Sequence, residues 1–425
     1  MRLTVYLCHH NSTPFALSVS LAFLVITFVW AVIKRPPIPE SVKIENPHQW
    51  GFPEWYGKAE PYFDSTPENV THSAARSVLL FIGGLFYDSY EMPHALTTLD
   101  ALRKAVSVNV SIITPFSSNW DHRVDTRENL ESVGCKQMDI LWRIGDFSGN
   151  IGGCEGAIWI SETFSKGVDP RANVFITEQP QQLLRPEVSH KELKEQQDEQ
   201  WQLGLFSYVA PPSVFYPSKR IPSPHFVTYF PSPNTKSCDF PRLPWGKGWS
   251  RHTPSARAPP PTKDGDDPLR EDSAYRKYWR SEEKRRAKAM RESGICLFEE
   301  WKDGTLNARM VEAMMSGCVV ATFPPHVEHD MLHPMILPLS KPFTLSNYLP
   351  TKDINSAIAK TSVDELRRKS LQAFMAARYH FVPAARLQSV WEVVDKWKEG
   401  GRGYNFPHGF RWDCESAVRP PWCHS

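Results

Sequence analysis

The sequence predicts an α/β fold with two Rossmann-like domains, preceded by an N-terminal transmembrane helix. Two strand–helix–strand patterns, at 77–114 and 294–323, predict parallel sheets, because such crossovers bring both strands into one sheet in the same direction. The third observation is an uncharged apolar run at 14–33. At 1.5 Å rise per residue, this run is long enough to cross a hydrocarbon core of about 30 Å.

Composition excludes some classes of protein. The 425 residues include 49 Lys and Arg against 47 Asp and Glu, which leaves a formal net charge of +2. So small a charge gives no electrostatic footprint for nucleic acid, and we expect no nucleic-acid partner. The chain is 41% hydrophobic and can bury a large core, which excludes a wholly disordered protein. Its 37 prolines predict proline-punctuated loops.

The apolar run at 14–33 predicts a single membrane-spanning helix within an anchor of residues 1–35. A cleaved signal peptide is the alternative, but its apolar region is only about 7–15 residues long and ends at a small-residue site. This run instead ends near Trp30, Lys34 and Arg35. Basic residues flank both ends, so the positive-inside rule does not set the orientation. We expect a single-pass, signal-anchor protein of the Golgi or endoplasmic reticulum with a lumenal body.

The sequence contains three N-glycosylation sequons, which bear on whether the body of the protein is lumenal. They occur at Asn11, Asn69 and Asn109, and the last two can carry glycans only if the body is lumenal. This pattern is consistent with a glycoprotein.

The eight cysteines show no paired zinc-ligand spacing. In an oxidising compartment, Cys135 could pair with Cys154, or Cys414 with Cys423. Buried free thiols are the alternative, and the sequence leaves both interpretations open.

Residues 36–75 are rich in proline, glutamate, histidine and aromatic residues without periodicity, which predicts a juxtamembrane stem. The N-terminal Rossmann-like domain is expected at 76–215. A helical pattern covers 95–106. Apolar runs predict strands at 77–82, 108–114, 140–144, 157–160 and 173–177, with a weaker one at 205–209.

Residues 216–272 are dense in proline, so we expect an interdomain connection or insertion with one strand at 225–229. A basic helix is predicted at 275–291. Because Glu282 and Glu283 interrupt its basic residues, the pattern favours a solvated helix face over binding to nucleic acid or an acidic membrane.

The C-terminal Rossmann-like domain, expected at 273–400, contains the clearest unit of the sequence. A buried strand at 294–298 leads to a helix at 305–316 and a second strand at 318–323. A short strand follows at 335–339. Helices are predicted at 362–379 and 383–398, and Pro383 suits the first turn of the last one. Residues 401–425 are expected to form a C-terminal tail.

The helix at 305–316 is the candidate binding element, because it leaves the carboxyl end of a parallel strand, where such sheets bind ligands. Its first N–H groups lack partners and form an anion site with the helix dipole. Thr305, Arg309, Glu312 and Ser316 share one face. Arg309 could therefore bind a diphosphate and Glu312 ribose hydroxyls. A salt bridge between these two on an exposed helix is the alternative.

Residues 293–332 resemble the donor-binding region of GT-B-fold glycosyltransferases, particularly the fungal group 1 (family 1/4-like) glycosyltransferase-like membrane proteins. The Glu-Ala-Met of 312–314 and the Gly-Cys-Val-Val of 317–320 match the family's pattern. The resemblance implies a nucleotide-sugar-binding domain in which Glu312 binds the ribose. It also implies that the helix start, with Thr305, Asn307 and Arg309, binds the diphosphate.

The resemblance further implies a hexosyltransferase-type reaction without metal or other cofactor, in which a sugar moves from a nucleotide sugar to a hydroxyl of a glycan, protein or lipid acceptor. Many such transferases carry a glutamate where this chain has Gly304. A catalytically inactive GT-B-like membrane scaffold or binding protein is therefore the alternative. In GT-B proteins the final helix also packs back across the interdomain cleft.

Three further residues are expected to line the cleft. Gly83 and Gly84 resemble the glycine loop of GT-B N-terminal domains, and an ordinary strand-to-helix turn is the alternative. His326 lies in the loop after the strand at 318–323. The catalytic base stays unassigned, because neither His94 nor His326 has a specific position in the pattern.

Overall fold

The computed structural model describes residues 42–43, 76–83, 87, 92–105, 107–145, 154–163, 172–177, 202–205, 209–218, 220–221, 226–230, 249–252, 267–298, 308–322, 327–329, 335–339, 356–357, 359–401, 403–405 and 410–412. The transmembrane helix predicted at 14–33 lies outside these residues. Among the helices that are described, none is long and apolar enough to cross a membrane.

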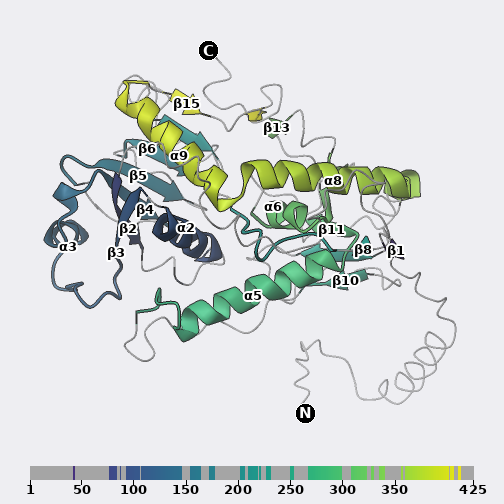
Figure 1. Ribbon diagram of the computed structural model, residues 1–425, viewed down its shortest axis with the longest axis horizontal. Helices are drawn as coiled ribbons and strands as arrows, with labels where there is room; N and C mark the ends of the chain where they lie inside the picture. Colours follow the sequence, from purple (N-terminus) through teal and green to yellow (C-terminus); the bar gives the residue numbers. More distant parts are fainter. Residues whose placement is uncertain are drawn as a thin grey trace, which may run out of the picture.

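The first domain is built on a parallel sheet with strand order β15-β7-β6-β5-β4-β2-β3 (Figure 1). Continuous apolar runs predicted most of these strands, because a parallel strand is buried on both faces. In chain order, the strands are β2 (Arg76–Ile82), β3 (Val108–Ile113), β4 (Ile140–Ile144), β5 (Ile158–Thr163), β6 (Val174–Thr177), β7 (Gln202–Leu205) and β15 (Gly403–Asn405).

The second domain is built on a parallel sheet with order β10-β9-β11-β12-β14. Its strands are β9 (Val227–Phe230), β10 (Trp249–Arg251), β11 (Ile295–Phe298), β12 (Val319–Thr322) and β14 (Leu337–Pro338). This sheet takes β9 and β10 from the range 216–272, which we expected to be a connection or insertion. Likewise, β15 comes from the expected tail and pairs with β7 in the first sheet. Strands of three residues show no periodicity, so β10 and β15 could not be predicted from the sequence.

Two short antiparallel pairs complete the strands: β1 (Val42–Lys43) with β8 (Arg220–Ile221), and β13 (Val327–His329) with β16 (Phe410–Trp412). The two large sheets share one plan. In each, the second strand along the chain lies on one side of the first strand, and the later strands lie on the other side. The order therefore reverses between β2 and β4 and again between β9 and β11. Sheets of this type bind ligands beyond the carboxyl ends of the strands at such a reversal.

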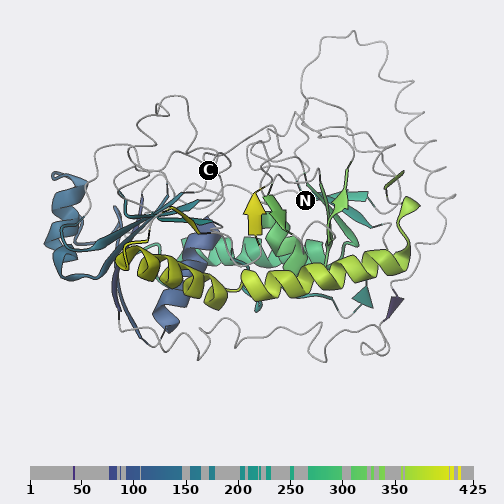
Figure 2. The ribbon, with the colours of Figure 1, turned by 90° about the horizontal axis from the view of Figure 1, so that it is seen from above.

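The last two helices tie the domains together. Helix α8 (Val363–His380) packs on the second domain against α6 (Ala308–Met315) and β12, and α9 (Pro383–Lys398) packs on the first domain against β6, β7 and α2 (Met92–Lys104). Figure 2 shows α8 and α9 running one after the other along both domains. The chain thus returns to the first domain, as the GT-B resemblance implies for the final helix. Pro383 occupies the first turn of α9, where its missing N–H costs nothing.

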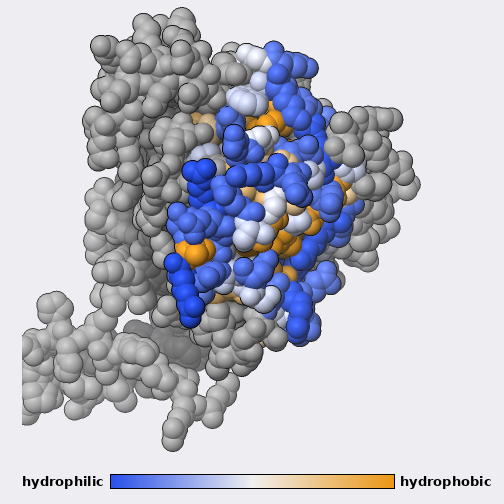
Figure 3. Space-filling model, turned by 90° about the vertical axis from the view of Figure 1, so that its left-hand side faces the viewer, coloured by the Kyte–Doolittle hydropathy of each residue, from blue (hydrophilic) through white to orange (hydrophobic). Residues whose placement is uncertain are grey.

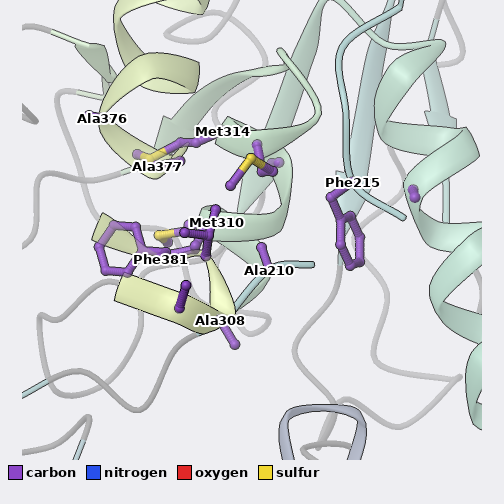
Figure 4. Packing of buried hydrophobic residues seen from close by; sticks show 14 of the residues in the cluster. Ala210, Phe215, Ala308, Met310, Met314, Ala376, Ala377 and Phe381 are labelled. Carbon is purple, nitrogen blue, oxygen red and sulfur yellow. The ribbon is translucent and has the colours of Figure 1, made fainter. Parts of the chain in front are cut away.

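Helix α6 is buried in the second domain by its apolar side chains. Met310 and Met314 lie beside Ala377 of α8 and Phe381, which directly follows α8 (Figure 4), and all four belong to one buried cluster. The small alanine leaves room for the long thioether side chains to pack closely. Burying each methionine contributes roughly 1.5–3 kcal/mol. This packing fixes the position of α6 and therefore of the charged residues on its other face.

Helix α5 (Ala274–Arg291) spans both domains, as Figure 1 shows. Tyr275 and Trp279 belong to the core of the first domain, whereas Ala287 and Met290 belong to the cluster around α6. The predicted solvated charged face is present, since Lys277, Lys284 and Lys288 are exposed. The two glutamates do not belong to that face, and Glu282 and Glu283 are only 7% and 1% exposed.

Two disulfides close the domains, one in each. Cys135 is bonded to Cys154, which is one of the two pairings that the sequence left open. Cys296 of β11 is bonded to Cys318, just before β12, and the sequence did not suggest this pairing. Cys414 and Cys423 lie outside the described residues.

Helix α9 is held on the first sheet by a buried ion pair. Arg386 donates from Nη1 to Thr98 Oγ1 at 2.7 Å and from Nη2 to Glu162 Oε1. The other carboxylate oxygen of Glu162 accepts from Trp142 Nε1 at 2.8 Å. The side chains of Arg386 and Glu162 are 4% and 0% exposed, so neither charge has water as an alternative partner.

We predict that Arg386→Met lowers the free energy of unfolding by about 3–5 kcal/mol, because it leaves the Glu162 carboxylate buried without its cation. Chemical denaturation measures this loss. The double variant Arg386→Met/Glu162→Gln removes the unpaired charge and should recover most of the stability. As a control, Arg127→Met breaks the exposed pair with Glu131 and should cost less than about 1 kcal/mol. Equal losses for the two single variants would contradict this account.

Candidate functional site

His94 brings the first domain into contact with the second. It lies in the first turn of α2, which follows β2 and Gly83, and it is 3% exposed. Its Nδ1 accepts the backbone N–H of Val209 at 3.4 Å. The proton of the neutral ring is therefore assigned to Nε2, which lies 3.9 Å from Glu312 Oε1 of α6. The sequence marked His94 and Glu312 separately and gave no sign that they meet.

Glu312 forms a bidentate ion pair with Arg286 of α5. Arg286 donates from Nη2 to Glu312 Oε1 at 2.7 Å and from Nε to Oε2. The side chains are 9% and 2% exposed, for Arg286 and Glu312 respectively. The planar guanidinium matches the two carboxylate oxygens, and such pairs are stronger than single charged hydrogen bonds. The pair therefore locks α5 to α6 inside the second domain.

A continuous row of buried polar side chains links the two ion pairs across the domain junction. Thr98 accepts from Arg386 and donates from Oγ1 to the His94 carbonyl oxygen at 2.9 Å, while His94 faces Glu312. We call this row the interdomain polar chain. Its members, from the first sheet to α5, are Glu162, Arg386, Thr98, His94, Glu312 and Arg286. Each is less than 9% exposed. Burying this many charges is costly unless they are paired. The interdomain polar chain therefore fixes the relative positions of α2, α5, α6 and α9.

The electrostatics of the junction keep His94 uncharged. Burial, followed by the positive charges of Arg286, Arg386 and Arg309, lowers the pKa of His94 to about 3. The hydrogen bond from the Val209 N–H acts in the opposite direction and is the smallest of these influences on the pKa. His94 is therefore a neutral imidazole at physiological pH.

His252 occupies a similar environment at the end of β10. Its backbone N–H donates to the Tyr229 carbonyl at 3.0 Å, and its ring stacks on Phe230 at 5.3 Å between centroids. Burial and then the charges of Arg286, Arg285 and Arg309 lower the pKa of His252 to about 3. Arg309 thus lies close enough to affect both imidazoles, one on each side of the junction.

The structure places the candidate donor-binding residues as follows. Arg309 and Glu312 lie on α6, and Arg309 is partly exposed whereas Glu312 is buried. The exposed-helix alternative does not hold, because Glu312 pairs with Arg286 in the interior. Gly83 directly follows β2, and its N–H donates to the Ile144 carbonyl of β4 at 3.2 Å, across the reversal point of the first sheet. The remaining candidates, Thr305, Asn307, Gly84 and His326, lie outside the described residues. The donor-binding roles stay predictions.

Sequence reasoning missed Arg286, although a signal for it existed. Tyr275, Trp279, Ala287 and Met290 recur at helical spacing and mark the buried face of α5. Arg286 lies next to Ala287 on that face. A charged residue within an apolar stripe predicts a buried ion pair rather than a solvated face.

A pocket of about 240 Å³ opens farther along α2, between the two domains. It is lined by Asp100 and Lys104 of α2, by Arg280 and Lys284 of α5, and by Pro383 at the start of α9. Three cationic groups against one carboxylate make the pocket electropositive. Elsewhere in the described residues, no three His, Cys, Asp or Glu side chains converge as a metal-binding group.

No protein-family model matches this chain, and no curated protein matches it. Solved structures match at low identity. An α-glucosyltransferase in complex with UDP-glucose and DNA containing an abasic site is 10% identical, with a TM-score of 0.43 over 76% of this chain and 100% of that one. Sucrose-phosphate synthase from Thermosynechococcus elongatus is 12% identical, with a TM-score of 0.45 over 75% and 99%. The calicheamicin glycosyltransferase CalG4 is 10% identical, with a TM-score of 0.33 over 76% and 99%. The fold assignment stands on the strand order and helix packing of this chain.

We predict that acid destabilises the protein through His94. Its pKa in the folded state lies below the value of about 6.5 in an unfolded chain, so the unfolded state binds the proton first as pH falls. The stability contribution is complete above about pH 6.5 and is lost as pH falls toward 3. Between pH 7 and pH 5 this amounts to about 1–2 kcal/mol.

Denaturation at a series of pH values measures the effect, with His94→Gln as the test. This variant has no group that titrates in the range, so its stability should fall less steeply between pH 7 and pH 5 than that of the wild type. Parallel pH curves for the two proteins would show that His94 is not the group responsible.

Proposed function

We propose that this protein is a membrane-anchored glycosyltransferase of GT-B type, which moves a hexosyl group from a nucleotide sugar to a hydroxyl of a glycan, protein or lipid acceptor. The observation that carries the proposal is the contact between the first turn of α2 and α6, where His94 Nε2 faces the Glu312 carboxylate that Arg286 binds. Two parallel sheets with the same reversal of strand order, and a final helix that returns to the first domain, support it.

Transfer from a nucleotide sugar needs positive charge beside the departing diphosphate. Arg309 suits this role, because it lies in the first turn of α6 and is partly exposed. The positive end of the α6 helix dipole adds to the attraction for an anion. We therefore assign the diphosphate to Arg309 and to the start of this helix, where Thr305 and Asn307 precede it. In this proposal the Arg309 guanidinium and the helix dipole supply the positive charge, and no metal ion is needed.

His94 serves in this proposal as a positioning residue rather than as the base. Its Nδ1 is used by the Val209 N–H, and its Nε2 faces Glu312, so no lone pair is left for an acceptor hydroxyl. Its contact with Glu312 sets the first domain against the donor-binding domain. We leave the general base unassigned.

One observation favours the alternative of a catalytically inactive GT-B-like membrane scaffold or binding protein. The Glu312 side chain is 2% exposed and Arg286 holds both of its oxygens, so a ribose must displace part of this pair to reach it. Gly304 also favours this alternative, because many such transferases carry a glutamate at its position. Nucleotide binding and turnover together separate the two functions.

We predict that the detergent-solubilised full chain binds UDP or GDP and that Arg309→Ala weakens this binding at least about tenfold. A hydrogen bond to a charged group contributes about 1.5–3 kcal/mol, and each 1.4 kcal/mol is tenfold in affinity. Calorimetric titration measures the affinity. Arg127→Ala, on the exposed surface of α3 (Thr126–Ser132), is the matched control and should bind as the wild type does.

Turnover is measured with a panel of UDP- and GDP-sugars. We expect sugar release or transfer by the wild type and a loss in Arg309→Ala. Glu312→Gln keeps the shape of the side chain and tests the ribose role separately. Binding without turnover for every donor would favour the scaffold, and no binding of either nucleotide would contradict both the donor site and the proposed reaction.

A further inference from the structure

The open edge of the first sheet has an unusual composition. Strand β3 (Val108–Ile113) reads VNVSII and is the last strand on its side of the sheet in the part of the chain that the structure describes. It contains no charged residue and no proline, and most of its residues have high β-propensity. A segment with this composition on an open edge can pair with a strand of another molecule. Natural proteins usually protect such edges with a charge, a proline or a covering group.

The apolar residues of β3 are only partly covered. Val108, Val110 and Ile112 pack against the core around α2 but keep intermediate exposure, and Asn109 is exposed. Figure 3 views this side of the molecule, where hydrophobic residues reach the surface among hydrophilic ones. Asn109 is in register with Ser77 of β2, whose backbone N–H and hydroxyl are both bound by Asp139. The amide of Asn109 therefore lies on an ordered and accessible strand.

Asn109 is also the first residue of the sequon Asn109-Val110-Ser111. From the sequence alone, this sequon could not be distinguished from a chance match. The structure supplies two reasons to think that it is used. A glycan needs an exposed asparagine, and Asn109 is exposed. A sequon is used only in a secretory compartment, and the body contains the disulfides Cys135–Cys154 and Cys296–Cys318, which persist in oxidising compartments.

We propose that the body is lumenal and that Asn109 carries an N-linked glycan, which covers the open edge formed by β3. The donor is an oligosaccharide linked to a lipid diphosphate. The Asn109 Nδ2 forms a bond to the anomeric carbon as the bond from that carbon to the diphosphate oxygen breaks. Nδ2 loses one proton, and the lipid diphosphate leaves with the electrons of the broken bond.

The proposal also fixes the orientation of the chain. With residues 14–33 as a membrane span, Asn11 lies on the opposite, cytosolic side and stays unmodified, whereas Asn69 and Asn109 lie on the lumenal side. The glycan is bulky and hydrophilic, so it prevents a strand of a second molecule from docking beside β3. This role does not depend on the transferase activity proposed above.

The test uses the full chain expressed in a eukaryotic secretory host and treated with peptide N-glycosidase. The enzyme converts a glycosylated asparagine to aspartate, which peptide mass spectrometry locates at residue 109. We expect the modification in the wild type and in Ser111→Thr, which keeps the sequon and suits a β-strand. We expect it to be lost in Asn109→Gln and in Ser111→Ala. Finding Asn109 unmodified in the wild type, or all four disulfide cysteines reduced, would overturn the proposal.

Size-exclusion chromatography tests the role of the glycan at the edge. Asn109→Gln and Ser111→Ala should both show a larger aggregated fraction than Ser111→Thr. The two variants remove the glycan through different substitutions, and each leaves the edge at β3 uncovered. If the unglycosylated variants aggregate no more than Ser111→Thr, the glycan does not protect the edge. Sugar-nucleotide binding should be unchanged in all of these variants, so this outcome is separate from that of the donor-site experiments.

Discussion

Two buried arginine–glutamate ion pairs lie on opposite sides of the junction between the two domains, and His94 lies between them. Glu162 with Arg386 joins the first sheet to α9, and Glu312 with Arg286 joins α6 to α5. Each pair lost the hydration of its charges on folding, and breaking either one would leave an uncompensated charge in the interior. The helices that carry these residues are therefore restricted to positions that satisfy the whole interdomain polar chain at once.

This restriction explains how the two domains work as one unit. Helix α5 belongs to both cores, since Tyr275 packs in the first and Met290 in the second. Helix α9 returns to the first domain, where Arg386 is held. The apolar packing of α6 on α8 then presents Arg309 at the junction, near the imidazoles of both His94 and His252. The lowered pKa values of these two histidines follow from the burial and the arginines that the fold brings to them, and not from the net charge of the chain, which is only +2.

Local patterns predicted much of the fold. The strand Ile140–Ile144 and the helix Pro383–Lys398 were predicted with their observed bounds, because the first is a continuous apolar run and the second has a clear start and end. β10 was not predicted, since its three residues pair only through distant contacts with β9. The disulfide between Cys296 and Cys318 was missed because strand register, not spacing, brings those cysteines together. The two sheets and their helices could therefore be predicted, but the pairing of remote segments could not.

The candidate site shows the same division. The apolar pattern of 305–316 located α6 and marked Arg309 and Glu312, but Arg286 was read as part of a solvated helix. Its partner lies 26 residues away in sequence, and nothing local indicates that the two meet. The proposed binding of the diphosphate rests on Arg309. The most direct test is a structure of the protein with UDP or GDP bound. The account predicts diphosphate oxygens within hydrogen-bond distance of the Arg309 guanidinium and the start of α6. A diphosphate bound elsewhere, or none at saturating nucleotide, would contradict it.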